Sequence, residues 1–284
     1  MTSIRAIVVT IMLVVCTVFY FLFLCSTGTL APANAGPIGR FDLHIARVFC
    51  NLRDDGLIRF FTLVTAFGSW RVVFLLAAAA SLLLGLARRS SYLPGLWMTL
   101  VGSQTVNQFL KDLFLRARPD HAVYQEVSSS FPSGHSAASV ALFGFLTYVM
   151  LRERSGPKLL VLIGGISVIT LVGLSRLVLG EHYPSDVLSG YLVGAVWLSM
   201  GICLTELRSR NALETGVKIT PRRRRAAFVV ISFTAIALYF VVKTYTSGLQ
   251  PAHQAASARL QPPDLATNVE EATTEKPALL SPKA

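Results

Sequence analysis

The sequence predicts an all-α, polytopic membrane helical bundle. Hydrophobic residues make up 53% of the 284-residue chain and charged residues only 14%, whereas a typical soluble domain has about 25% charged residues. Apolar stretches also recur at nearly the length of a membrane-spanning helix, which is about 20 residues. So few charges cannot cover a water-facing surface, which argues against an ordinary soluble domain. The high hydrophobicity excludes a chain that is disordered throughout.

Seven apolar stretches are predicted as spans. In chain order they are Ala6–Cys25, Val72–Ala87, Leu93–Phe114, Ala137–Leu151, Leu159–Leu179, Val187–Leu204 and Ala226–Val242. The second and fourth are short and need flanking residues to complete a crossing. The first could instead be a secretory signal peptide with Ala33-Asn34-Ala35 as its cleavage site. Its apolar core is longer than the usual 7 to 15 residues or so, however, and an uncleaved helix is favoured.

The loops between the spans predict the orientation, because Lys and Arg gather on the cytoplasmic side. If the spans alternate, one side receives Arg5, Arg88, Arg89, Arg152, Arg154, Lys158, Arg208, Arg210, Lys218 and Arg222–Arg225. This side is predicted to be cytoplasmic, with the N-terminus inside and the C-terminal tail outside. The net charge of +11 is then explained without a nucleic-acid partner. We interpret Arg222–Arg225 as an orientation anchor, with binding of anionic lipid head groups as the alternative.

Two further segments have a distinct composition. In Ser26–Arg71, apolar residues from Phe41 to Leu52 recur at roughly helical spacing, with charged residues between them. This pattern predicts an amphipathic helix that lies on the outer membrane surface or packs against the bundle. The tail after Lys243 is rich in Ala, Pro, Thr and Glu and has no apolar period, so it is predicted to be disordered.

Ionisable residues at the predicted outer ends of spans three to six indicate a functional site. At the centre of a membrane helix such a residue costs about 2.5–3.5 kcal/mol on insertion scales. The residues are Lys111, Arg118, His135, Arg176, Glu181, His182 and Asp186. A single His or Arg at an interface is usually structural. A set of complementary groups at one depth, with an excess of positive charge, predicts a pocket that binds an anion.

The residue types favour phosphoryl transfer in that pocket. Arginine has a planar fork that suits phosphate oxygens, and Ser133 and Gly134 open span four with further donors. Asp186 can orient one nitrogen of His182 and leave the other as a nucleophile. A second histidine, His135, is available to protonate the leaving oxygen. Because positive side chains can supply the charge that Mg²⁺ supplies in kinases, neither a metal nor a cofactor is predicted.

Three ordered motifs carry a family resemblance. Lys111–Pro119 reads KDLFLRARP and fits KxxxxxxRP, Pro132–His135 reads PSGH, and Ser175–Asp186 reads SRLVLGEHYPSD and fits SRxxxxxHxxxD. Together they resemble the type 2 phosphatidic acid phosphatase superfamily, whose membrane members include lipid phosphate phosphatases and undecaprenyl pyrophosphate phosphatases. No defining position departs from the pattern. The resemblance covers roughly Phe41 to Leu204.

The resemblance implies a role for each matching residue. His182 is then the nucleophile, oriented by Asp186, and His135 the general acid. The phosphate-binding groups are Lys111, Arg118, Ser133, Gly134 and Arg176, while Glu181 falls at a variable position. The family has a six-helix core, so the chain is divided into an N-terminal span and loop (1–36), a catalytic core (37–206), a basic loop (207–225), an added seventh span (226–242) and the tail (243–284).

The expected function is hydrolysis of a lipid phosphomonoester or diphosphate head group in the outer leaflet of a bacterial plasma membrane. The candidate substrates are undecaprenyl pyrophosphate, phosphatidylglycerol phosphate, phosphatidic acid and lipid A phosphates. Three alternatives use the same site: a lipid phosphotransferase, a vanadate haloperoxidase, and a protein that binds or transports a lipid phosphate. The spans argue against the haloperoxidase, which is a soluble class, and the His182–Asp186 pair argues against pure binding. The sequence does not indicate an oligomeric state.

Overall fold

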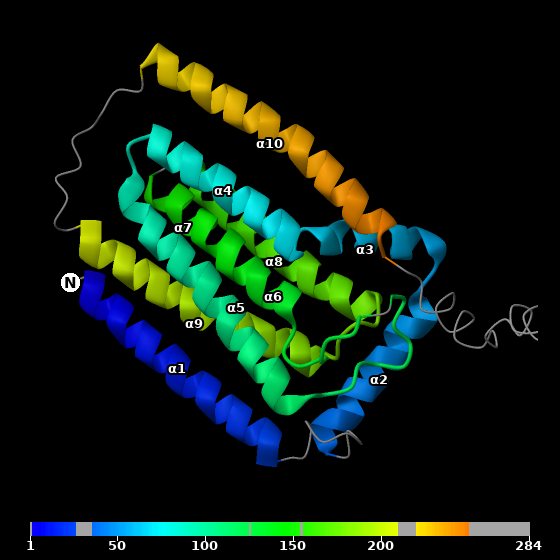
Figure 1. Cartoon of the computed structure of the whole chain (residues 1–284). Helices are drawn as coiled ribbons and strands as arrows, with labels where there is room; N and C mark the ends of the chain where they lie inside the picture. Colours follow the sequence, from blue (N-terminus) through cyan, green and yellow to red (C-terminus); the bar gives the residue numbers. More distant parts are fainter. Residues whose placement is uncertain (1, 27–35, 125, 154–155, 210–219, 250–284) are drawn as a thin grey trace, which may run out of the picture.

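The structure is a computed structural model that describes residues 2–26, 36–124, 126–153, 156–209 and 220–249 (Figure 1). All regular elements in these residues are helical, as predicted. They are α1 (Thr2–Ser26), α2 (Pro37–Leu52), α3 (Asp55–Ala66), α4 (Trp70–Leu86), η1 (Ser90–Tyr92), α5 (Leu93–Phe114), α6 (Gly134–Ser139), the π-helical turn η2 (Val140–Gly144), α7 (Phe145–Arg152), α8 (Lys158–Val178), α9 (Pro184–Ser209) and α10 (Pro221–Ser247).

Five helical stretches in the described residues are long and apolar enough to cross a membrane. They are Ile7–Ser26, Gly134–Arg152, Lys158–Val178, Pro184–Arg208 and Pro221–Ser247. A sixth is the pair α3 and α4, which is bent by 45° at a short break. The short second and fourth predicted spans are thus extended by flanking residues, as expected. The chain is a multi-pass membrane protein.

Helix α5 has the bounds predicted for the third span, yet it is not among those apolar stretches. The reason is the polar face that it turns into the bundle, where Thr99, Ser103, Asn107 and Lys111 are all buried. These side chains lower the hydropathy of a helix that packs extensively against α9. A hydropathy test therefore undervalues a helix whose polar face is enclosed by protein.

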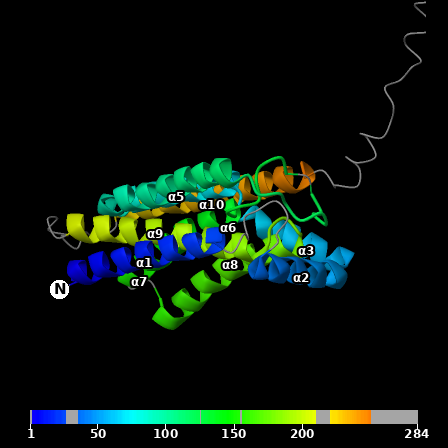
Figure 2. The same ribbon diagram turned by 90° about the horizontal axis from the view of Figure 1, so that it is seen from below.

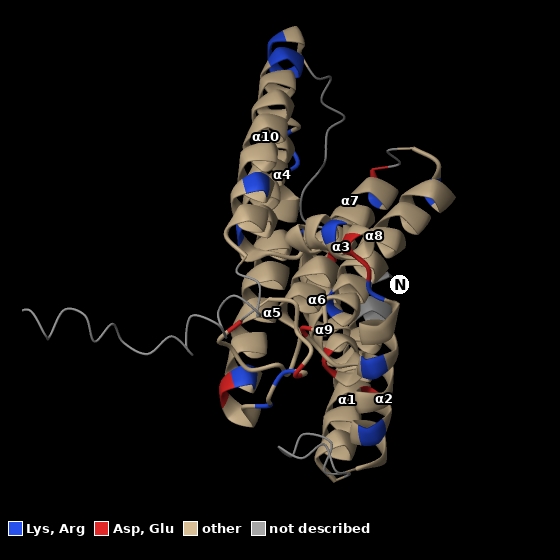
Figure 3. Cartoon of the chain, turned by 90° about the vertical axis from the view of Figure 1, so that its right-hand side faces the viewer, with Lys and Arg blue, Asp and Glu red and all other residues tan. Residues whose placement is uncertain are grey.

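The bundle is arranged around α9, which packs against α5, α1 and α6. Both views show α9 between α1 and α5 (Figures 1 and 2). On the other side of the molecule, α10 packs along α4 and also contacts α3. Along most of their length the helices carry few charged residues, as Figure 3 shows, which is the pattern expected of surfaces that face lipid.

The predicted amphipathic helix is α2, and it packs against the bundle, which is one of the two predicted placements. Gly39, Asp42 and Ala46 form its buried face, which packs against α8 and α9. Ile38 and Phe49 also pack against buried apolar residues, whereas Phe41 and Leu52 are 56% and 63% exposed.

Some predicted boundaries shift in the structure. Helix α10 begins at Pro221 and ends at Ser247, so Arg222–Arg225 lies at its start and the first residues after Lys243 are helical. The four cysteines are free. The predictions for Ala33-Asn34-Ala35, for the basic residues Arg154, Arg210 and Lys218, and for the tail from residue 250 onward lie outside the described residues.

Candidate active site

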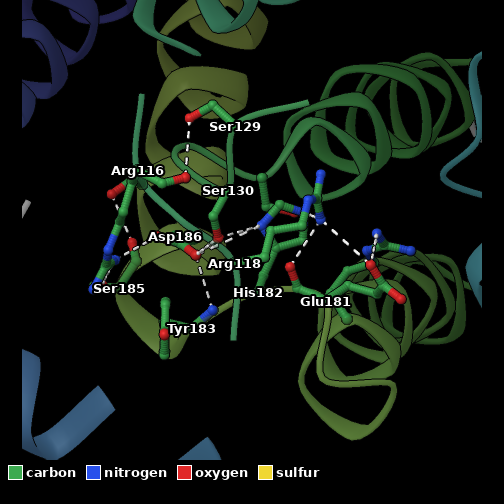
Figure 4. Close-up of polar contacts among 12 residues, drawn as sticks. Arg116, Arg118, Ser129, Ser130, Glu181, His182, Tyr183, Ser185 and Asp186 are labelled. Carbon is green, nitrogen blue, oxygen red and sulfur yellow. Dashed lines mark hydrogen bonds and ion pairs between the residues drawn. The ribbon is translucent and has the colours of Figure 1, made fainter. Parts of the chain in front are cut away.

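Segments far apart in the sequence meet in one polar cluster, in which Arg118 and Asp186 lie on either side of His182 (Figure 4). The segments are the last turn of α5, the α5–α6 connection, the first turn of α6, the last turn of α8, the α8–α9 connection and the first turn of α9. These segments carry every predicted site residue, namely Lys111, Arg118, Ser133, Gly134, His135, Arg176, His182 and Asp186. Ion pairs, hydrogen bonds and one shared pocket connect them.

The Arg118 guanidinium joins the α5–α6 connection to the α8–α9 connection. Its Nε donates to the carbonyl oxygen of Ser128 (2.9 Å), and its Nη1 donates to the carbonyl oxygen of Glu181 (2.8 Å). Nη1 also lies 3.3 Å from Nε2 of His182. Because a guanidinium can only donate hydrogen bonds, Nε2 of His182 is the acceptor and carries no proton in this arrangement.

The carboxylate of Glu126 bridges two of the predicted phosphate ligands. Its Oε2 accepts from Nη2 of Arg118, and its Oε1 accepts from Nη2 of Arg176, each at 2.7 Å. Burial alone would raise the pKa of this carboxyl, but the charges of Arg176 and Arg118 outweigh it and hold the pKa well below its ordinary value. An ionised carboxylate thus lies between two guanidinium groups, a position that also suits a phosphate.

His182 is buried beside this arginine pair. Its Nδ1 lies 3.6 Å from Oδ2 of Asp186 and 3.5 Å from Oγ of Ser130. Burial lowers the pKa of the imidazole well below its ordinary value, and the charges of Arg118 and Arg176 lower it further. The imidazole is therefore neutral, with Nδ1 toward Asp186 and an unprotonated Nε2 toward Arg118.

Asp186 reaches His182 less directly than the sequence predicts. At 3.6 Å, Nδ1 of His182 and Oδ2 of Asp186 are neighbours but are too far apart for a hydrogen bond. Ser130 lies beside both, because its Oγ donates to Oδ2 of Asp186 at 2.5 Å. The same Oδ2 accepts from the backbone N–H of Tyr183 at 2.8 Å. The Asp186 carboxylate is thus held in place beside His182 by the Ser130 hydroxyl and the Tyr183 N–H.

Behind Asp186 lies a buried ionic network that includes Arg116. Its guanidinium pairs with Asp186 at 2.5 Å and with Asp42 of α2 at 2.8 Å, and none of the three side chains is more than 1% exposed. The ring of Tyr183 packs 4.4 Å from the guanidinium carbon. Ser185 bonds to both Arg116 and Asp42. This network attaches α2 to the start of α9.

The other predicted donors differ in their surroundings. Lys111 donates to the carbonyl oxygen of Ser129. A Cβ at Gly134 would lie 3.3 Å from Oδ1 of Asn107, so a larger residue there would crowd α5. Ser133 is fully buried behind Gly134, and its hydroxyl accepts from Ser136 at 3.0 Å. The Ser133 hydroxyl acts as an acceptor in this contact, so its own proton is still available for a ligand.

A pocket of about 460 Å³ joins the polar cluster to an apolar groove. Its polar end is lined by Lys111, Arg118, Glu126, Gly134, His135 and His182. Its apolar wall comes from α4 and α5, with Trp70, Val73, Phe74, Ala77, Trp97, Leu100 and Val101. Phe74 and Val101 are 59% and 57% exposed, so the groove reaches the outer surface of the bundle between α4 and α5.

Sequence analysis missed Arg116, Glu126 and Ser130, whose side chains contact predicted site residues, and Asp42, which pairs with Arg116. Arg116 lies two positions before Arg118, at a variable position of the KxxxxxxRP motif. Glu126 and Ser130 lie in an irregular connection where no periodicity indicates which way a side chain points. Asp42 alone gave a signal in the sequence, because it is an acidic residue within the predicted amphipathic helix. The structure shows that its side chain is buried.

Comparison with known proteins finds relatives that are similar to the part of the chain that carries most of this site. Residues 92–210 match the PAP2 superfamily. A phosphatidylglycerophosphatase B of Bacillus subtilis is 36% identical over 107 residues, which are 35% of this chain and 52% of that protein. A lipid A 1-phosphatase of Rhizobium johnstonii is 34% identical over 116 residues, 37% of this chain and 44% of that protein.

A solved structure extends the similarity to the fold. The crystal structure of a transmembrane PAP2-type phosphatidylglycerolphosphate phosphatase from Bacillus subtilis is similar, with a TM-score of 0.56 and 27% identity. The matched region covers 70% of this chain and 98% of the Bacillus subtilis chain. The chain spans about half the length of the two curated relatives described above. The resemblance predicted from the three motifs is confirmed: residues 92–210 of the chain match the PAP2 superfamily.

Proposed function

We propose that this protein is a membrane lipid phosphatase that transfers the phosphoryl group of a lipid phosphate to His182 and then to water. The observation that supports it best is the pocket between α4, α5 and the polar cluster. At one end of the pocket lie the Arg118 guanidinium, the Lys111 ammonium group and the His182 imidazole, and its other end is a wall of apolar side chains. A molecule that fits both ends has a phosphate head and a hydrocarbon chain.

The phosphate is expected to bind between Arg118 and Arg176, in place of the Glu126 carboxylate. The Nε of Arg176 is buried and has no hydrogen-bond partner among the described residues, so it has a donor left for a phosphate oxygen. Lys111 lines the same end of the pocket. Three positive groups around one phosphate stabilise charge on its equatorial oxygens during transfer.

In the first step, Nε2 of His182 attacks phosphorus, a P–N bond forms and the P–O bond to the lipid breaks. The leaving oxygen takes a proton from His135, which lines the pocket. Asp186 stabilises the positive charge that His182 gains, through Nδ1. In the second step, water attacks phosphorus and gives a proton to His135. The P–N bond breaks, and phosphate leaves.

We also propose the sidedness and the setting that the basic loops predict. The site then faces the non-cytoplasmic side of a bacterial plasma membrane, and the lipid reaches it from the outer leaflet. The phosphotransferase alternative keeps the first step and replaces water by another lipid. No described residue favours that acceptor over water, so hydrolysis is the function that we propose.

The test is phosphate release by the purified full-length protein in detergent micelles. The panel contains phosphatidylglycerol phosphate, phosphatidic acid, lipid A and a polyprenyl diphosphate. We expect free phosphate from at least one lipid, a ³²P-labelled protein after rapid quenching at alkaline pH, and no activity in His182→Asn. The matched control is His44→Asn, an exposed histidine on α2. Undiminished release by His182→Asn would overturn the role of this residue.

The same assay tests metal independence. Because Lys111, Arg118 and Arg176 supply positive charge, activity is expected to survive EDTA. A loss that Mg²⁺ restores would contradict the proposed mechanism. A phosphorylated second lipid in place of free phosphate would favour the transferase.

A further inference from the structure

Helix α10 lies outside residues 92–210, which match the family, yet it reaches the candidate site. It packs along α4 and contacts α3, and its C-terminal end comes close to the site end of the bundle (Figure 1). There the side chain of Tyr245 is half-buried. Its Oη lies 3.2 Å from Nε2 of His135, and the two rings are 6.5 Å apart, centroid to centroid.

We propose that Tyr245 is a positioning residue for the reaction, which holds the imidazole of His135 for proton transfer to the leaving oxygen. This inference rests on the proposed function. A tyrosine hydroxyl can donate one hydrogen bond and also accept. Because Oη of Tyr245 occupies Nε2, the proton that His135 passes to the leaving oxygen is the one on Nδ1, and Nε2–H donates to Oη both before and after the transfer. A partner of this kind keeps the ring in place through both protonation states.

This contact joins a helix outside the matched residues 92–210 to a site residue within them. His135 lies in the first turn of α6, and the structure gives its Nε2 a hydrogen-bond partner from a different helix. Without Tyr245 the imidazole would lose this hydrogen bond, which fixes the direction of Nε2. General acid–base catalysis contributes about 10²- to 10⁴-fold and depends on the distance to the proton acceptor, so misplacing the ring loses part of that factor.

The leaving group distinguishes this role from a structural one. A lipid alkoxide needs a proton in order to leave, whereas an aryl oxide such as p-nitrophenolate leaves without one. We expect Tyr245→Phe to lower kcat/KM for an alkyl lipid phosphate about tenfold or more, and to change kcat/KM for p-nitrophenyl phosphate by less than about twofold. The parameter kcat/KM is chosen because it excludes the later hydrolysis of the phosphohistidine.

Two controls complete the experiment. Tyr239→Phe removes a hydroxyl from the same helix at a residue that is 62% exposed, and both activities should stay at the wild-type level. In a double-mutant cycle, Tyr245→Phe should add no further loss to His135→Ala, because its effect passes through His135.

Three outcomes overturn the inference. They are a Tyr245→Phe protein with wild-type values for both substrates, one with equal losses for both, and losses that add fully to those of His135→Ala. Failure of the proposed function is distinguishable, because the wild-type protein itself would then release phosphate from neither substrate, and the inference would fall with it.

Discussion

Glu126 lies where we propose that the phosphate of the substrate binds, and its two oxygens already bond to Arg118 and Arg176 at 2.7 Å. A substrate must displace this carboxylate before it can use both guanidinium groups. Hydrogen bonds to charged groups contribute about 1.5–3 kcal/mol each. The carboxylate therefore competes with phosphate and limits how tightly the product is held.

Replacing that carboxylate by a neutral amide should strengthen binding of anions. We expect Glu126→Gln to lower the inhibition constant of inorganic phosphate or orthovanadate about tenfold, which corresponds to about 1.4 kcal/mol. Because its neighbours hold the pKa of Glu126 below the ordinary value, the residue stays ionised above about pH 5. The ratio of the mutant and wild-type constants should then be the same from about pH 5 to pH 8.

The control for this measurement is Glu153→Gln. Glu153 follows α7, pairs with Arg89 at 2.9 Å and does not line the pocket. Equal inhibition of Glu126→Gln and the wild-type protein would show that the carboxylate does not compete with the anion.

Among single residues, the sequence predicts those whose identity and spacing phosphoryl transfer requires. Lys111, Arg118 and His182 are of this kind, because each supplies a group that a phosphate or a nucleophile requires. Arg116 and Ser130 are not, because their partners depend on how the chain folds back. Arg116 meets Asp42 across 74 positions of the sequence, and no local pattern encodes such a contact.

Helices α4 and α5 form the two walls of the apolar groove. Their side chains that line it include both buried residues, such as Leu100, and exposed ones, such as Val101. A groove that is open along one side accepts a chain without enclosing it. The selection of lipid chains is therefore expected to depend on these two helices rather than on the charged cluster.

A bulky residue at the opening should affect lipids and spare small phosphates. We expect Val101→Trp to lower kcat/KM for a long-chain lipid phosphate several-fold, because the indole narrows the groove. Activity on a water-soluble aryl phosphate should stay within about twofold, since only the lipid chain uses the groove. The control is Ile166→Trp on α8, at a site that is 55% exposed and outside the pocket. Equal losses for both substrates would contradict the assignment of the groove.

The helices themselves are predicted well where a long apolar run decides them. The predicted Leu93–Phe114 coincides with α5, and Leu159–Leu179 differs from α8 by one residue at each end. The sequence did not predict that α3 and α4 form one bent pair, because α3 carries charged residues among its apolar ones. The start of α10 was also misplaced, since hydropathy alone cannot assign Arg222 to a helix.

The whole molecule is held together at the site end by the Asp42–Arg116–Asp186 network. It links α2, the α5–α6 connection and α9 through side chains that are almost fully buried. Breaking a buried ion pair by removing one partner typically costs about 3–5 kcal/mol. The contribution of half-exposed pairs is about 0–1 kcal/mol.

We therefore expect Asp42→Ala to destabilise the protein by about 3 kcal/mol or more and to reduce turnover, because Arg116 also holds Asp186. Thermal unfolding in detergent micelles measures the first effect and phosphate release the second. Arg89→Ala is the control, since the Arg89–Glu153 pair has side chains that are 30% and 23% exposed. A midpoint for Asp42→Ala no lower than that of the control would contradict the role of the network.

At the scale of the molecule, composition and apolar run length were sufficient for the class of protein and the order of its helices. They did not predict how α2 sits, because a helix with one polar and one apolar face can use either face against the bundle. Here Asp42 is buried, because it has a cationic partner inside the protein, while Arg40 and Arg47 stay exposed. The partner is Arg116, and only the fold brings it next to Asp42.

Because the groove opens sideways between two helices, the substrate concentration that matters is the density of the lipid in the membrane. A lipid that enters the groove diffuses only within its own leaflet and does not pass through water. The encounter rate then follows how many molecules of that lipid lie in each unit of surface. Two cells with the same total amount of substrate would run this reaction at different speeds if their envelopes differed in area.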